Sequence, residues 1–234
     1  MMIHAIVGRA QSGKDTVASI LEWKLRELGA ERVKIVRLAG PLKSICSQIW
    51  TQIDFNDEEQ KKIHRQKLVR MGTAVREIDI HAWVRLACSY FGTCPTLYSP
   101  PDHLIIPDVR FWSELYYLFY SYGRRNGFSH GVGVYAVYAS EDTRERRMGV
   151  EGWREYEKVR NSPSETQSAR LAEGYELKAS RFINNSGNTT LDDLFSFCNP
   201  WSVDTLPGDC REDLETLRGR VKLVGDERAL VLDE

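Results

Sequence analysis

The segment from Gly8 to Thr16, which reads GRAQSGKDT, constrains the fold more than any other part of the sequence. It follows a short apolar run, residues 3–7, and precedes a segment with helical apolar spacing, residues 15–28. Glycines let such a loop curl until its backbone N–H groups face one point, and the helix N-terminus adds positive potential there. With the charge of Lys14, the loop predicts a cradle for a nucleoside triphosphate. The alternative is an ordinary glycine-containing turn between a strand and a helix.

One position in this loop departs from the usual pattern, which places Ser or Thr directly after the lysine as a magnesium ligand. Here Asp15 follows Lys14, and Thr16 comes one place later. Asp15 can bind Mg²⁺ directly, bind it through water, or cap the helix by accepting backbone N–H groups. We therefore expect ATP and Mg²⁺ as cofactors, with Asp15 and Thr16 as the candidate metal ligands.

Short runs rich in β-branched residues alternate with longer segments of helical spacing, which predicts a parallel sheet with crossover helices. The expected strands are residues 3–7, 33–38, 104–106, 132–138 and 182–184. The expected helices are residues 15–28, 42–50, 57–71, 82–91 and 113–122. The fold class is thus α/β, a three-layer P-loop sandwich with about five parallel strands. A charged span that is poor in aliphatic residues, 140–172, is expected to be an inserted lid without a packed resting position.

Composition limits the classes of protein further. With 234 residues, 42% of them hydrophobic, the chain fits one globular domain. A formal net charge of -1 gives no basic field for sequence-independent nucleic-acid binding, so genomic nucleic acid is not an expected partner. Apolar stretches are strand-length, and the five cysteines form no CxxC pair. We expect a cytoplasmic protein without a membrane partner, and a homodimer is left open.

Beyond the loop, several blocks in the same order resemble the phage deoxynucleoside monophosphate kinases. These blocks are LAGPLK at residues 38–43, RQKLVRMGTAVR at 65–76, AWV at 82–84, PDVRFWSE at 107–114, SE at 164–165 and NNSG at 184–187. The resemblance covers residues 1–197, which we take as one kinase-like domain with its lid at about 140–172. It also implies a viral or phage origin and, in that case, the host cytoplasm. The extension from 198 to 234 has no assigned role.

The resemblance and the chemistry of the side chains together give a set of candidate site residues. The expected catalytic residues are Lys14, Asp108 and Arg110. The expected ATP-binding residues are Gly8, Ser12, Gly13, Lys14, Asp15, Thr16, Arg144 and Arg147. The expected acceptor-binding residues are Leu42, Lys43, Arg65, Arg76, Trp83, Asp108, Arg110 and Glu114. In this scheme Arg65 and Arg76 flank a predicted turn at Gly72-Thr73 and converge on the acceptor phosphate.

Each of these assignments has a purely structural alternative. Asp108 and Arg110 can pair with each other at the end of a strand, and Glu114 can be solvated. Trp83 can belong to the core instead of stacking on a base. The arginines at 144, 146 and 147 can form a solvated helix face instead of closing over ATP.

The expected function is transfer of the γ-phosphoryl group of ATP to a deoxynucleoside monophosphate, which is the expected small-molecule partner. The acceptor phosphate is ionised at neutral pH, so no strong general base is required. Three alternatives are kinases of other acceptors: phosphomevalonate, dephospho-coenzyme A, or a hydroxymethylated pyrimidine in DNA. A fourth is a regulatory module that binds nucleotide without transferring phosphate, an alternative that Asp15 keeps open.

Overall fold

The computed structural model describes residues 2–92, 101–118, 132–172, 181–187, 189, 223–224 and 227–228. Five parallel strands form its central sheet in the order β2-β3-β1-β4-β5. They are β1 (Met2–Val7), β2 (Val33–Ile35), β3 (His103–Val109), β4 (Val132–Tyr138) and β5 (Arg181–Asn184). Two further strands, β6 (Leu223–Val224) and β7 (Glu227–Arg228), pair with each other in antiparallel fashion. The predicted α/β class with about five parallel strands is confirmed.

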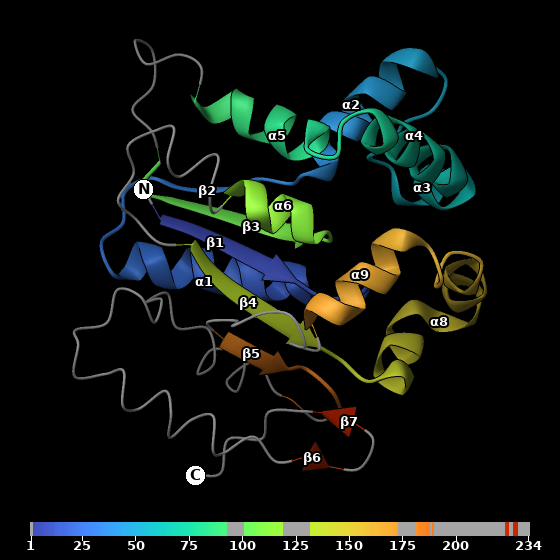
Figure 1. Ribbon diagram of the computed structural model, residues 1–234. Helices are drawn as coiled ribbons and strands as arrows, with labels where there is room; N and C mark the ends of the chain where they lie inside the picture. Colours follow the sequence, from blue (N-terminus) through green and yellow to red (C-terminus); the bar gives the residue numbers. More distant parts are fainter. Residues whose placement is uncertain are drawn as a thin grey trace.

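Helices cover both faces of the sheet, which makes three layers (Figure 1). On one face α1 (Lys14–Glu27) packs its apolar stripe against β1, β3, β4 and β5. On the other face lie α5 (Ala82–Gly92), α6 (Trp112–Tyr116) and the end of α9 (Pro163–Ala172). The strands carry near-continuous apolar sequence because both of their faces are buried.

A further group of helices lies next to α5 at one end of the molecule (Figure 1). It comprises α2 (Ala39–Ile49), α3 (Glu58–Ile63) and α4 (Arg65–Ile78), and it has its own small core around Cys46, Ile53 and Phe55. The prediction of one helix over 57–71 was wrong, because the helix is interrupted at His64, which separates α3 from α4. Residues beyond Tyr117 and Leu118 of the predicted helix at 113–122 lie outside the described residues.

The predicted turn at Gly72-Thr73 was also wrong, because α4 runs through both residues. Gly72 serves close packing instead: a Cβ there would lie 3.3 Å from the Leu42 side chain. Its carbonyl oxygen accepts the indole N–H of Trp83 at 3.0 Å and a guanidinium N–H of Arg76 at 3.2 Å. The small residue thus brings α2, α4 and α5 together.

Two strand ends differ from the prediction, each for its own reason. The predicted strand at 33–38 stops at Ile35, because the chain turns into α2 at Leu38. The strand predicted at 104–106 extends to Val109 with an irregular register beside β1 between Ile106 and Val109. Pro107 lies within this bulge, and a proline cannot donate to the ladder. The bulge places Asp108 where it reaches the start of α2.

The lid segment differs most from expectation. It consists of α8 (Glu141–Glu157), broken at Gly149, and α9. Thr143, Arg144 and Tyr156 of α8 are buried, as is much of α9. The expectation of a span without a packed resting position was therefore wrong. No helix of the described residues is long and apolar enough to cross a membrane.

A buried polar contact lies in the sheet itself. His4, in β1, has no exposed surface and hydrogen-bonds with Tyr135 Oη at 3.2 Å and His103 Nδ1 at 3.0 Å. Burial, with a smaller contribution from His103, lowers the pKa of His4 from 6.5 to about 3. His4 is consequently neutral in the folded protein over a range in which it is protonated in the unfolded chain.

This difference predicts a pH dependence of stability. Between pH 6.5 and about 3 unfolding takes up a proton at His4, so the free energy of unfolding falls as the pH falls, by up to about 1.4 kcal/mol per pH unit. Denaturant unfolding at a series of pH values measures the slope. His4→Gln retains a hydrogen-bonding side chain but does not titrate, and it is expected to have a shallower slope. Equal slopes for both proteins would contradict the prediction.

Candidate active site

The glycines of the loop between β1 and α1 are fixed by contacts and by backbone conformation. A Cβ at Gly8 would lie 2.4 Å from the carbonyl oxygen of Val137. Gly13, with φ 97°, has the Asn185 side-chain amide 2.1 Å from where its Cβ would be. Asn185 in turn donates from Nδ2 to the carbonyl of Ser12 at 2.9 Å. The ends of β4 and β5 therefore hold the loop in its curled form.

Lys14 lies inside this loop. Its ammonium group donates to the carbonyl oxygens of Gly8 at 2.7 Å and Arg9 at 2.5 Å. Burial, followed by the nearby charge of Arg110, lowers its pKa from 10.5 to about 7. An anion beside the ammonium group would restore the usual pKa. The arrangement favours binding of a phosphate at this point.

Beside the loop lies a cavity of about 130 Å³ between the end of β4, the start of α8 and α9. Ser12 and Arg144 line it. Both side chains are buried, and Ser12 Oγ and Arg144 Nε have no hydrogen-bond partner among the described residues. A buried polar atom without a partner is costly, so the cavity fits a polar or anionic group.

The lid arginines differ in position. Arg147 donates to the carbonyls of Gln11 at 3.2 Å and Asn185 at 3.0 Å, so it touches the loop. Arg144 is buried against Tyr156, to whose hydroxyl it donates at 3.0 Å. Arg146 bonds within its own helix, to Asp142 and Thr143. Of the three, Arg144 and Arg147 are placed beside the loop.

Asp15 and Thr16 lie exposed in the first turn of α1. Asp15 forms an ion pair with Arg37 at 2.5 Å, a contact from α1 to the segment after β2. The described residues contain no group of three His, Cys, Asp or Glu side chains arranged around a metal ion. A carboxylate and a hydroxyl next to a phosphate loop are nonetheless the oxygen donors that Mg²⁺ takes together with phosphate oxygens.

Asp108, predicted to be catalytic, makes structural contacts. Its two oxygens accept the backbone N–H groups of Leu38 at 2.7 Å and Ala39 at 2.8 Å, which caps α2. Because both oxygens already accept hydrogen bonds, the geometry gives no support to a catalytic role. Asp108 and Arg110 do not form the pair that the structural alternative predicted: Asp108 accepts the N–H groups of Leu38 and Ala39, and Arg110 donates to Glu165.

Glu114 is buried, which excludes the alternative that it is solvated. Its Oε2 accepts the backbone N–H groups of Arg110 at 2.8 Å and Phe111 at 3.1 Å, and its Oε1 pairs with Arg76 at 3.3 Å. Arg76 also lies over the ring of Phe111, 4.2 Å from its centroid. Burial raises the pKa of Glu114, against the opposing charge of Arg76. Both residues primarily hold the end of β3 in place.

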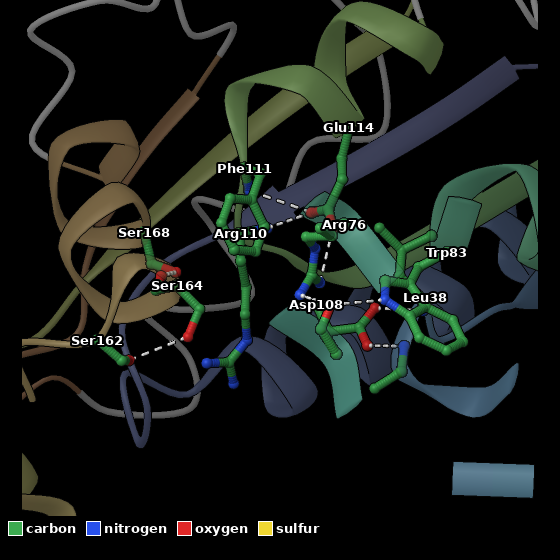
Figure 2. A network of polar contacts seen from close by, with 12 residues as sticks. Leu38, Arg76, Trp83, Asp108, Arg110, Phe111, Glu114, Ser162, Ser164 and Ser168 are labelled. Atoms are coloured by element: carbon green, nitrogen blue, oxygen red, sulfur yellow. Dashed lines mark hydrogen bonds and ion pairs between the residues drawn. The ribbon is translucent and has the colours of Figure 1, made fainter. Parts of the chain in front are cut away.

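Arg110 lies between the serines of α9 and the group formed by Arg76 and Asp108 (Figure 2). Its Nη1 donates to Glu165 of α9 at 2.5 Å. Glu165 was noted in the sequence only as part of a matching dipeptide. No spacing rule links it to Arg110, because 55 residues separate them.

The remaining predicted acceptor residues divide between site and scaffold. Arg65, at the start of α4, is partly buried; burial lowers its pKa, whereas Glu165 raises it. The charge of Glu165 thus acts on Arg65 as well as on Arg110. Leu42 packs in the small core of the α2–α4 group, and Lys43 is partly exposed. Trp83 is buried, so the prediction that it stacks on a base was wrong.

Comparison with known proteins gives one match to a family model. Residues 6–124, just over half of the chain, match the model described as phosphomevalonate kinase. No curated protein matches the sequence. Among solved structures, the chain overlaps the APS kinase CysC of Mycobacterium tuberculosis in complex with AMPPNP and APS. That overlap has 13% identity and a TM-score of 0.37, and covers 83% of this chain and 93% of that one. Neither match bears on a phage origin or a deoxynucleotide acceptor.

The contacts of Gly13 predict the effect of adding one methyl group. Gly13→Ala combines a left-handed φ with a clash against Asn185, so we expect nucleotide binding to weaken at least about tenfold. Gly29→Ala is the matched control: Gly29 has φ 88°, and its added Cβ would meet nothing within 4 Å. It is expected to lose about 1 kcal/mol of stability and to bind nucleotide normally. Nucleotide titration tests this, and equal binding by the two variants would contradict it.

The environment of Lys14 predicts proton uptake when nucleotide binds. At about pH 8 Lys14 is a neutral amine in most molecules of the free protein, and bound phosphate would restore its proton. Binding enthalpies measured in buffers of different ionisation enthalpy should therefore show uptake of up to about one proton. Lys14→Arg keeps a cation that does not titrate in this range and should abolish the uptake. Enthalpies that do not depend on the buffer would contradict the assignment.

Proposed function

The chain belongs to the phosphomevalonate kinase family, a family of P-loop kinases. We therefore propose that it transfers the γ-phosphoryl group of ATP to a small acceptor that carries a phosphate monoester. The observation that carries the proposal is that Glu165, at the carboxyl end of the sheet, contacts both the loop that holds Lys14 and the Arg110 guanidinium at the end of β3. Its charge also acts on Lys14 of α1 and on Arg65 of α4, so one buried carboxylate balances cations from three elements. Ligands of open α/β sheets bind at this end.

The donor side of the proposed site is the loop from Gly8 to Thr16. Its backbone would cradle the phosphates of ATP, and Lys14 would leave the carbonyls of Gly8 and Arg9 to stabilise charge on the transferred group. Arg144 and Arg147, beside the loop, would add positive charge from the lid. Asp15 and Thr16 would hold Mg²⁺, which would neutralise part of the phosphate charge when bound.

The acceptor side lies toward α2–α4, with Arg65 and Arg110 as the proposed ligands of the acceptor phosphate. An ionised phosphate is its own nucleophile once repulsion between the two anions is screened. The carboxylates nearby fit a reaction without a general base. Asp108, Glu114 and Glu165 each accept backbone N–H groups, and the two glutamates also pair with arginine.

Phosphomevalonate is the first candidate acceptor, since it is the substrate in the name of the family. It carries a phosphate and a carboxylate but no aromatic base, which fits a site whose predicted stacking residue, Trp83, is buried. A deoxynucleoside monophosphate is the second candidate. It is supported by the order of the sequence blocks at 38–43, 65–76 and 107–114. The proposed catalytic unit extends past the family match at 124, because β4 and β5 complete its sheet.

An assay of ADP release against a panel of acceptors tests the proposal. We expect ATP turnover to depend on phosphomevalonate, and Lys14→Ala to lower it by a factor on the order of 100 or more while the protein stays folded. Turnover with deoxynucleoside monophosphates alone would select the second candidate. Nucleotide binding without transfer to any acceptor would contradict kinase activity and favour a regulatory module.

A further inference from the structure

Glu165 connects three parts of the proposed site. It lies in the first turn of α9 and is 2% exposed. One carboxylate oxygen accepts from Arg110 at 2.5 Å, and the other accepts the backbone N–H of Ala10, in the loop, at 3.3 Å. A single side chain thus links the helix that ends the lid, the loop that would hold ATP, and an arginine that would hold the acceptor.

The charges around Glu165 keep it ionised. Burial alone would raise its pKa, but Arg110, the Ala10 N–H, Lys14 and Arg65 together hold the pKa below its usual value. The carboxylate therefore stands among the three cations of the proposed site. It offsets part of their mutual repulsion, which would otherwise push Lys14, Arg65 and Arg110 apart.

The geometry leaves Arg110 able to bind a further anion. Its backbone N–H is held by Glu114, and its Nη1 by Glu165. The Arg110 side chain remains 30% exposed, and a guanidinium has two further nitrogens that donate. Arg110 is thus fixed at both ends while part of its donor edge stays accessible. This is how a phosphate ligand would be held ready in a fixed geometry.

We propose that Glu165 is a positioning residue for phosphoryl transfer, which sets the Arg110 guanidinium in line with the loop so that donor and acceptor phosphates meet in reactive geometry. The inference rests on the proposed function and deepens it. It makes α9 part of the machinery that aligns the two substrates, in addition to any role in covering them. Glu165 acts through Arg110 and the loop and does not itself touch the transferred group.

The test is a double-mutant cycle between Glu165 and Arg110, measured with the acceptor that the panel identifies. Glu165→Gln keeps the size of the side chain and removes its charge. We expect kcat to fall on the order of 10- to 100-fold, as for a displacement of about 1 Å at a reacting centre, with little change in the KM for ATP. In an Arg110→Ala background the same change should cause little further loss, because the residue through which Glu165 acts is gone.

Two further variants separate positioning from support of the fold. Glu151→Gln removes an exposed carboxylate of α8 and should leave turnover unchanged. Glu165→Asp keeps the charge but withdraws it by one methylene, and it replaces Glu165→Gln if that variant does not fold. A loss of turnover with an unchanged unfolding midpoint would support the proposal.

Three outcomes would overturn the proposal. The first is wild-type turnover in folded Glu165→Gln or Glu165→Asp. The second is an equal loss with and without Arg110, because Glu165 would then act independently of it. The third is unfolding of both Glu165 variants, because the carboxylate would then support the fold itself. Absence of transfer by the wild-type protein to every acceptor would instead contradict the proposed function, so the two failures are distinguishable.

Discussion

The burial of positive charge at the carboxyl end of one parallel sheet is the constraint on which the rest of this structure depends. Lys14 is 8% exposed and Arg144 only 1%. Charge removed from water must be paired or hydrogen-bonded, or the fold loses stability. The protein meets most of this requirement in two ways: some cations donate to carbonyl or hydroxyl oxygens, and others pair with buried carboxylates, while Nε of Arg76 and of Arg144 has no partner among the described residues.

The buried carboxylates connect the layers of the fold as well as balancing charge. Asp108 ties the end of β3 to the start of α2 through two backbone N–H groups. Glu114 ties the turn after β3 to Arg76 of α4. Glu165 ties α9 to the loop and to Arg110. All three partnerships meet at Asp108–Arg110, the segment where β3 ends. This segment therefore connects the α2–α4 group with the loop.

Two residues expected to contact substrate make structural contacts in this frame. The indole N–H of Trp83 satisfies the carbonyl of Gly72 in the middle of α4, so the ring is held within a contact between helices. Arg76 lies over Phe111 and pairs with Glu114. Residue type alone does not separate such roles from ligand binding. An arginine suits a buried carboxylate as well as a phosphate, and a tryptophan suits a core as well as a base.

The sequence by itself determined the elements whose cause is local. Apolar periodicity placed all five strands and α1, and the glycines with Lys14 identified the loop, because strand, loop and helix are adjacent in the chain. The tertiary structure alone decided the partners of Asp108, Glu114 and Glu165, and whether the lid packs. Apart from the N–H groups of Arg110 and Phe111 that Glu114 accepts, those contacts join residues tens to more than a hundred positions apart, as between Ala10 and Glu165. Such pairs form only when the sheet brings distant strand ends together, and no local pattern encodes that approach.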